Sequence, residues 1–299
     1  MSPESQSIRE LLQEGWMRLE HNSVPNARRN AEWMLASALR CSVLDLFADS
    51  HRAAAADGAD RYRRFLARRT AREPLQYITG DTAFMSLPFR IRPGVFVPRP
   101  DTEVLVEKME DKLKKYFRDI RVLDLCCGAG VIGISLAVRS PHCRVTGVDA
   151  SMEAVRLSQE NARLNGVSQR AQFVHATADD YGSGEKSLFT AVVCNPPYIA
   201  SGDIPLLPPE VKDHEPMDAL DGGADGLDFY RRVIPRLPAW IQRGGYAAFE
   251  IGASQKDAVI ALLLDAAFDE AESYRDYSGN DRVVLARRPM QFAANSSRR

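Results

Sequence analysis

Apolar residues recur every three or four positions along the first 80 residues, which is the spacing of helices that bury one face. The pattern breaks at Val24-Pro25-Asn26, and Ser42 stands where a cap would begin a short helix carrying Leu44 and Phe47. The apolar stripes comprise Ile8, Leu11, Leu12, Trp16 and Leu19, then Ala31, Met34, Leu35 and Ala38, and last Tyr62, Phe65 and Leu66. We therefore expect a small helical domain over residues 1–80.

From Thr82 to Val97 the pattern changes to short apolar segments separated by proline and glycine. Short strands joined by tight turns fit this pattern, and we expect a β-hairpin linker over residues 81–103. Pro98-Arg99-Pro100 stiffens the end of the linker, and Asp101-Thr102-Glu103 marks the start of a helix.

After Arg121, short apolar strands alternate with amphipathic helices. Strands are expected at residues 121–125, 144–148, 172–175, 190–194, 246–251 and 281–286, and helices at 131–139, 152–164, 226–242 and 255–267. Such alternation predicts the α/β class, with a mostly parallel sheet and helices on both faces. This domain would cover residues 104–288, and the polar residues 289–299 would form a disordered tail.

Composition narrows the function classes. The 299 residues carry 39 basic and 40 acidic side chains, so the basic excess of a dedicated duplex-DNA binder is missing. The charge-free apolar stretch at residues 125–138 is shorter than the roughly 18 residues of a membrane span, and the first residues show no signal peptide. Five cysteines without a CxxC pair disfavour disulfides and a metal cage. We expect a cytoplasmic protein without a metal, a membrane anchor or a stable nucleic-acid partner.

The first chemical motif is a strand, a small-residue turn and a helix over residues 122–133. Gly128, Gly130 and Gly133 have the spacing GxGxxG, and Asp149 ends the next expected strand. Glycines let a ligand approach the backbone, a helix N-terminus provides free N–H groups, and the acid can accept both ribose hydroxyls. A nicotinamide dehydrogenase, a protein that binds S-adenosylmethionine (SAM), and a tight turn without function all fit this motif.

The second motif, Asn195-Pro196-Pro197-Tyr198, directly follows the expected strand at residues 190–194. Strand ends line the ligand crevice of an open α/β sheet, and consecutive prolines hold the chain rigid. The Asn195 side chain and the Pro196 carbonyl would be two aimed acceptors for an amino group, and Tyr198 would stack on a flat amide or base. Hydride transfer needs no such arrangement, so the motif favours methyl transfer over a dehydrogenase. Its place at the end of a strand, after the glycine turn, favours a functional role over a turn in which Asn195 only caps the backbone.

With these motifs the chain resembles the release-factor glutamine methyltransferases, the HemK/PrmC type of SAM-dependent protein N5-glutamine methyltransferase. The resemblance spans residues 70–288 and is weaker over the helical region before them. The matching stretches are residues 72–80, 97–103, 195–199, 215–216, 219–223, 225–227, 250–252 with Gln255, and 281–284.

The resemblance implies a Rossmann-like, seven-stranded SAM-binding domain behind a small helical domain. From the change of pattern near Thr79 and the basic run at residues 61–72, we expect the helical domain at residues 1–80 to recognise the substrate. The family's substrate is the glutamine of the Gly-Gly-Gln motif in peptide-chain release factors, which would be the partners of this chain. The residues that align with cofactor-binding positions are Cys126, Cys127, Gly128, Ala129, Gly130, Asp149, Asp179, Asp180 and Asn195. Those that align with the substrate-binding motif are Asn195, Pro196, Pro197 and Tyr198, with Asn195, Pro196 and Tyr198 as catalytic residues. The chain departs from the pattern at Cys126-Cys127-Gly128, where similar proteins usually have Gly-Thr-Gly.

Three other functions stay open from the sequence. They are glutamine methylation of a ribosomal protein, N6-adenine methylation of a nucleic acid, and non-catalytic SAM binding. Residues 97–103 favour the release-factor branch, the near-neutral charge disfavours a nucleic-acid substrate, and an adaptor would not need Asn195 and Tyr198. A further open point is a basic run, for which a solvated helix face is favoured over a protein or ribosomal RNA contact: Arg61, Arg63, Arg64, Arg68, Arg69 and Arg72.

Overall fold

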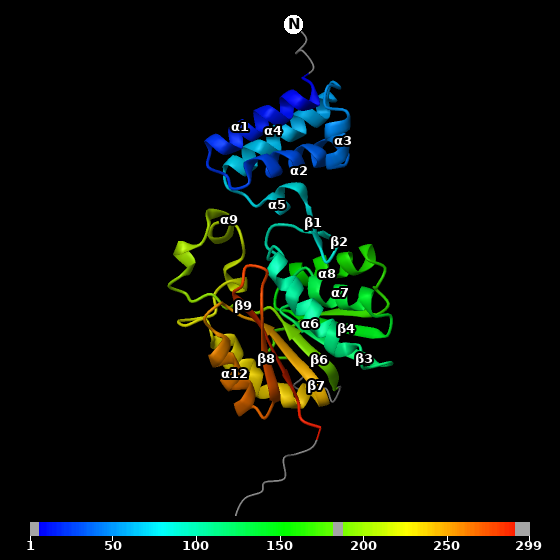
Figure 1. The fold of residues 1–299 in the computed structure, drawn as a ribbon, viewed down its shortest axis with the longest axis vertical. Helices are drawn as coiled ribbons and strands as arrows, with labels where there is room; N and C mark the ends of the chain where they lie inside the picture. Colours follow the sequence, from blue (N-terminus) through cyan, green and yellow to red (C-terminus); the bar gives the residue numbers. More distant parts are fainter. Residues whose placement is uncertain (1–5, 182–187, 291–299) are drawn as a thin grey trace, which may run out of the picture. The chain divides into compact units, whose positions relative to one another are not determined.

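The computed structural model describes residues 6–181 and 188–290, and the chain divides into two compact units (Figure 1). The smaller unit consists of Met1–Asp81 together with Pro208–His214. The larger unit consists of Thr82–Leu207 together with Glu215–Arg299. The chain therefore passes between the units three times, and the sequence pattern does not anticipate the second and third passages. The expected tail at residues 289–299 falls almost wholly outside the described residues.

The smaller unit is helical, as expected. Its helices are α1 (Ile8–His21), α2 (Ala27–Leu39), α3 (Val43–Ala48), α4 (Ala56–Thr70), α5 (Leu75–Thr79) and α9 (Pro209–Lys212). Apolar side chains of α1, α2 and α4 form its core, in which Leu11, Met34 and Leu66 are fully buried. Ser42 caps α3 as expected, but the buried residue of that helix is Leu46, whereas Leu44 and Phe47 are exposed. A six-residue helix has too few residues for its spacing to identify its buried face.

The basic run on α4 is only partly a solvated face. Arg69 is 5% exposed, and its guanidinium donates to Asn30 Oδ1 at 2.8 Å and to Glu210 Oε1 at 2.8 Å. Arg72 donates to the other oxygen of Glu210, also at 2.8 Å. The solvated interpretation is therefore wrong for Arg69, because its acidic partner lies 141 positions away in the chain and no local pattern reveals it.

The larger unit begins with a small two-stranded sheet, β1 (Asp81–Phe84) and β2 (Leu87–Arg90). The two residues between these strands, Met85 and Ser86, have φ values of 50° and 62°. Two successive positive φ angles match the twist of a tight β-hairpin. A 3-10 turn, η1 (Pro100–Thr102), then leads into α6 (Glu103–Leu113), at the helix start that the sequence predicts.

A seven-stranded sheet forms the centre of the larger unit, with strand order β5-β4-β3-β6-β7-β9-β8. Its strands are β3 (Ile120–Leu125), β4 (Cys143–Asp149), β5 (Ala171–His175), β6 (Phe189–Cys194), β7 (Ile241–Glu250), β8 (Asp269–Arg275) and β9 (Asp281–Arg287). The first five are parallel, and β9 lies antiparallel to both β7 and β8. The α/β class and the mostly parallel sheet are confirmed.

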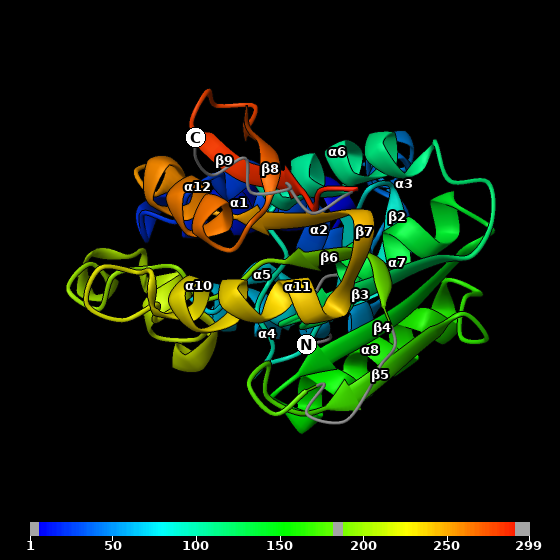
Figure 2. The same ribbon diagram turned by 90° about the horizontal axis from the view of Figure 1, so that it is seen from below.

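Helices cover both faces of this sheet (Figure 2). One face carries α6, α7 (Val131–Arg139) and α8 (Met152–Leu164). The other face carries α10 (Asp228–Val233), α11 (Leu237–Trp240) and α12 (Lys256–Asp265), whose apolar side chains pack on the strands in one continuous core. No helix within residues 6–181 and 188–290 has the length and apolar character needed to cross a membrane.

The prediction from the sequence differs from the structure of this unit at one helix and one strand. The single helix expected at residues 226–242 is divided into α10, the 3-10 turn η4 (Ile234–Arg236) and α11, because Pro235 and Pro238 interrupt the helical hydrogen bonds. Its last two residues, Ile241 and Gln242, already belong to β7. Strand β8 is not predicted at all.

The order of the strands places the ligand crevice. Going along the chain, the sheet grows from β3 through β4 to β5 and then returns to β6 on the other side of β3. In open α/β sheets, ligands bind at the carboxyl ends of the strands where the order reverses in this way. Both sequence motifs lie there, because the glycine turn follows β3 and Asn195 follows β6.

Candidate active site

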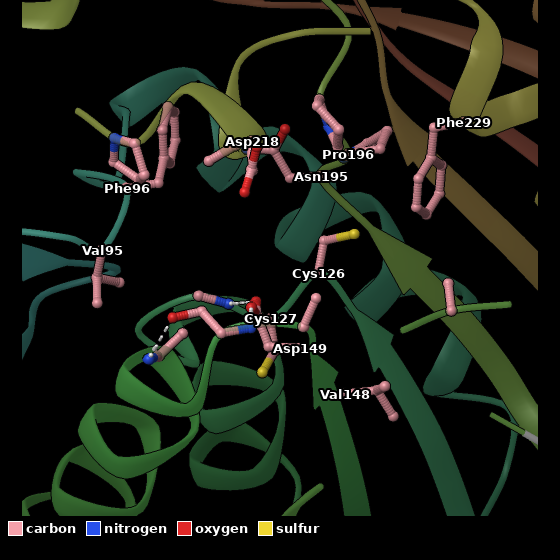
Figure 3. A pocket seen from close by; sticks show the side chains of 18 of the residues that line it. Val95, Phe96, Cys126, Cys127, Val148, Asp149, Asn195, Pro196, Asp218 and Phe229 are labelled. Atoms are coloured by element: carbon pink, nitrogen blue, oxygen red, sulfur yellow. Dashed lines mark hydrogen bonds between the residues drawn. The ribbon is translucent and has the colours of Figure 1, made fainter. Parts of the chain in front are cut away.

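A cavity of about 700 Å³ opens at the carboxyl ends of β3, β4 and β6, and residues of the larger unit line it (Figure 3). This volume is within the usual range for small-molecule and cofactor sites. Val95 and Phe96 lie on one side and Phe229 on the other, while Asn195 and Pro196 lie across the cavity from Asp149. The structure thus brings both predicted motifs to one place.

The glycine turn forms the floor of the cavity. Cys126, Cys127, Gly128 and Ala129 line it, and Gly130 begins α7 with a φ of 79°. A Cβ on Gly130 would approach Ile134 Cδ1 to 2.9 Å and Ser158 Cβ to 3.0 Å, so glycine is required there for space as well as for conformation.

Asp149, at the end of β4, is held in place by the turn it faces. Its Oδ2 accepts the Gly128 N–H at 2.8 Å, and its Oδ1 accepts the Ser151 N–H at 2.8 Å. Burial raises the pKa of this carboxyl, while the two N–H donors and the nearby His175 oppose that shift. These two hydrogen bonds orient the carboxylate before any cofactor arrives. Each oxygen keeps a further lone pair for a ligand.

The two acids expected among the cofactor-binding residues, Asp179 and Asp180, are placed differently. Asp179 lines the cavity, and its carboxylate lies 3.4 Å from Arg232 and 3.4 Å from Arg236. Asp180 is not among the lining residues; it is exposed, and its Oδ2 accepts the Thr177 hydroxyl at 2.7 Å. Of the two positions, the structure therefore brings only Asp179 to the cavity.

The motif at residues 195–198 forms the opposite wall. Asn195, Pro196, Pro197 and Tyr198 all line the cavity. The Asn195 amide donates from Nδ2 to Thr102 Oγ1 at 3.3 Å, and the Tyr198 hydroxyl donates to Glu250 Oε1 at 3.1 Å. Gln255 Nε2 donates to the Tyr198 carbonyl at 2.8 Å. This side chain, from the loop between β7 and α12, adds to the rigidity expected from the prolines.

A buried carboxylate joins two rims of the cavity. Glu215 is 6% exposed; it accepts the Val97 N–H at 3.1 Å and also pairs with Arg99. Val95 and Phe96 line the cavity from the segment that contains Val97, and Pro216 and Asp218 line it from the segment that follows Glu215. Burial raises the pKa of Glu215, whereas Arg99 and the Val97 N–H oppose the shift.

Sequence reasoning assigns no role to Thr102, Glu250, Phe96 or Phe229, although the structure places them in or directly behind the cavity. In the sequence, the stretches at residues 97–103 and 250–252 stand out only because they match the family pattern. Their one usable signal is position, because Glu250 ends a strand of the parallel sheet at the same edge as Asp149 and Asn195.

Comparisons with known proteins agree with this architecture. The "PrmC N-terminal domain" family matches residues 10–80, and the "Methyltransferase small domain" family matches residues 86–206. The "Release factor glutamine methyltransferase" of Geobacter sulfurreducens is 38% identical over 287 residues, which are 95% of this chain and 98% of that relative. The protein of the same name from Moorella thermoacetica is 38% identical, over 94% of this chain and 99% of its own. The chain belongs to the release factor glutamine methyltransferase family.

The first of two similar solved structures supports the fold of this family member. The 16S rRNA N2 G1207 methyltransferase of Thermus thermophilus, solved with AdoMet and guanosine, has a TM-score of 0.51 at 21% identity and covers 70% of this chain and 49% of its own. The release-factor-specific protein-(glutamine-N5) methyltransferase of Alicyclobacillus acidocaldarius is 30% identical, with a TM-score of 0.41, over 67% of this chain and 99% of its own.

The cavity of this methyltransferase fits SAM as its cofactor. Among the residues that the structure describes, the charged ones that line it are three acids, Asp149, Asp179 and Asp218, and one base, Arg232, so the lining favours a cationic sulfonium. Asp149 has free lone pairs for a ribose, and apolar residues that include Val148, Ala176 and Phe229 provide a surface for a flat base. Asp149 and the turn after β3 would hold the cofactor.

Proposed function

We propose that this protein transfers a methyl group from SAM to the side-chain amide nitrogen (N5) of a protein glutamine. The substrate that we assign is the Gly-Gly-Gln glutamine of peptide-chain release factors, with the reaction taking place in the cytoplasm. The observation that carries the proposal is the Asn195 amide, whose nitrogen is engaged by Thr102 at the wall of a cavity that fits SAM. The names of the relatives support the choice of substrate.

An amide nitrogen is a weak nucleophile, because its lone pair is delocalised into the neighbouring carbonyl. Asn195 directs its Nδ2 to Thr102, which leaves its Oδ1 to accept one N–H of the substrate amide. The Pro196 carbonyl is the second acceptor in our proposal. Two acceptors on the two N–H bonds orient the nitrogen and favour its change to a tetrahedral geometry, which is a positioning and electrostatic contribution.

Tyr198 packs beside these acceptors and keeps water from that side of the substrate amide. Its hydroxyl is committed to Glu250, and burial raises its pKa well above the ordinary value, so Tyr198 acts as a neutral ring rather than as a base. When bound, SAM supplies a methyl group activated by its sulfonium. The proton that the nitrogen loses after transfer is released to water.

We assign recognition of the protein substrate to the helical unit at residues 1–80, and we expect no stable nucleic-acid partner. The separate family match at residues 10–80 supports the first assignment. The balance of 39 basic and 40 acidic residues supports the second.

The substrate is tested with labelled SAM. The protein is incubated separately with a release factor, a ribosomal-protein fraction and nucleic acid, and we expect label on the release factor, at the glutamine of its Gly-Gly-Gln motif. Label only on a ribosomal protein, or on adenine, would identify one of the two alternative substrates and contradict the proposal.

The role of Asn195 is tested by substitution. We expect Asn195→Ala to lower kcat on the order of 10²–10³-fold with little change in SAM affinity, because its oxygen acts mainly in the transition state. Asn195→Asp keeps an acceptor and should retain more activity than alanine. Single-turnover methylation of a release factor and calorimetry with SAM separate the two effects. Near wild-type turnover by Asn195→Ala would reduce Asn195 to a turn cap.

A further inference from the structure

A buried carboxylate lies directly behind the wall at residues 195–198. Glu250 ends β7, and only 1% of it is exposed. Its Oε1 accepts the Tyr198 hydroxyl at 3.1 Å, and its carboxylate also forms a hydrogen bond with the Thr102 side chain. Burying a carboxylate is unfavourable unless polar groups compensate for the lost water, and Glu250 Oε2 finds no partner among the described residues. The position therefore requires an explanation beyond packing.

The hydrogen bonds around Glu250 have a fixed direction. An ionised carboxylate only accepts, so Thr102 must donate its single hydroxyl proton to Glu250. The lone pairs of Thr102 Oγ1 are then left to accept, and they accept Asn195 Nδ2 at 3.3 Å. An asparagine whose nitrogen is committed in this way presents its oxygen to the cavity. The orientation of the Asn195 amide thus follows from the charge on Glu250.

We propose that Glu250 is a positioning residue which, through Thr102, orients the Asn195 amide so that its oxygen faces the substrate. The proposal rests on the proposed transfer of a methyl group to a glutamine amide. It explains why a carboxylate is buried here: a neutral amide at position 250 could both donate and accept, and would allow Asn195 to turn its nitrogen towards a substrate nitrogen that is itself a donor. Glu250 holds Tyr198 in place through the same carboxylate.

The surroundings of Glu250 leave it ionised above about pH 7. Burial raises its pKa to about 7, while Thr102, Arg282 and Tyr198 lower it and Asp101 raises it further. Arg282 Nη1 donates to the Tyr198 hydroxyl at 3.4 Å, and Nη2 of the same side chain pairs with the buried Asp276 at 3.0 Å. From the helix side, the Tyr230 hydroxyl donates to the Glu250 backbone carbonyl at 2.7 Å.

The relay through Thr102 is tested by three threonine variants. Thr102→Val keeps the size of the side chain but removes the hydroxyl, and we expect kcat for release-factor methylation to fall on the order of 10–30-fold with unchanged SAM affinity. Thr102→Ser retains the hydroxyl and should restore most of the rate. Thr190→Val is the matched control, because Thr190 is 1% exposed and its hydroxyl accepts the Arg121 N–H away from the cavity. We expect that control to lower the melting temperature but not kcat.

The charge on Glu250 is tested by Glu250→Gln and a pH profile. In the wild type, kcat should fall as the pH drops below about 7, because a protonated Glu250 no longer forces Thr102 to donate. Glu250→Gln should be slow at pH 8 and should have lost this step in its profile, while KM for the release factor and SAM affinity stay near wild type. A purely structural role would change stability without changing the pH profile.

Two results would overturn the positioning role: a Thr102→Val or Glu250→Gln protein with wild-type kcat, or a Thr102→Ser protein as slow as Thr102→Val. Both results compare the kcat of a variant with that of a wild-type protein that methylates the release factor. A wild-type protein that labels no glutamine in any protein would instead contradict the proposed function itself, so the two failures are distinguishable.

Discussion

Cys126 shows how far this chain departs from its relatives at the level of one residue. Its φ is 53°, in the left-handed region where a side chain is strained by about 1–2 kcal/mol and glycine is not. The glycine expected from the family pattern would avoid this strain. Cys126 lines the cavity and packs against the core that contains Cys194 and Tyr230.

Substitution of Asp149 is the most direct test of the cofactor site. We expect Asp149→Ala to weaken SAM binding on the order of 10–100-fold, because the ribose loses its acceptors and the Gly128 N–H loses the carboxylate that holds the turn. Calorimetry with SAM measures the change. Asp180→Ala is the matched control, since that exposed acid does not line the cavity and its loss should leave affinity unchanged. Equal losses in both variants would contradict the role of Asp149 in holding the cofactor.

The residues of the site differ in how well sequence predicts them. Asn195, Tyr198 and Asp149 belong to compact motifs, and the structure brings all three to one cavity. Thr102 and Glu250 could not be assigned, because a sequence does not distinguish a carboxylate that is 1% exposed from one that is solvated. Their roles depend on contacts between segments 52 to 148 positions apart, which appear only after the chain has folded.

At the level of elements, the predictions fail where local pattern and final environment disagree. Strand β8 has the sequence DEAESYR and lies at the edge of the sheet with mostly exposed side chains, so no apolar run reveals it. It forms because β9 offers an antiparallel partner. Helices α7 and α8 have the bounds that their sequences predict, because both have clear starts: Gly130 precedes α7, and Ser151 caps α8.

The packing of α7 on the sheet gives a test at this scale. A Cβ on Gly133 would lie 2.6 Å from Val145 Cγ1 and 2.9 Å from Asp124 Oδ2, so the helix would have to move away from β3 and β4. We expect Gly133→Ala to lower the free energy of unfolding by about 1–3 kcal/mol, measured by urea denaturation. Gly202→Ala is the control, because no atom lies within 4 Å of its added Cβ. A Gly133→Ala protein as stable as the control would show that the helix adjusts without strain.

At the scale of the whole molecule, Glu210 is the anchor of the segment at residues 208–214. Both its oxygens are bound, one by Arg69 and one by Arg72. Burial opposes its ionisation, but the hydrogen bonds from Arg72 and Arg69 outweigh that effect and hold the pKa of Glu210 at about 2. Because the folded value lies below that of a free glutamate, about 4.3, this pairing stabilises the protein above that pH and is lost as the pH falls towards 2.

The pairing predicts a pH-dependent difference between two proteins. At pH 7, we expect Glu210→Gln to lower the free energy of unfolding by about 1.5–3 kcal/mol, because glutamine removes the negative charge and leaves one acceptor oxygen for two charged donors. The difference from wild type should shrink as the pH falls below about 4. Urea denaturation at pH 7 and pH 3 measures it. Asp213→Asn, an exposed position in the same segment, should match the wild type, and a difference that is equal at both pH values would contradict the assigned pKa.

The discontinuous smaller unit limits how members of this family can exchange parts. A chimera built by joining the first 81 residues of one relative to the remainder of another would keep a foreign segment 208–214. The two arginines would then come from one parent and their carboxylate from the other. The helical unit is therefore encoded by two separate stretches that must be inherited together, and neither can diverge freely without a matching change in the other.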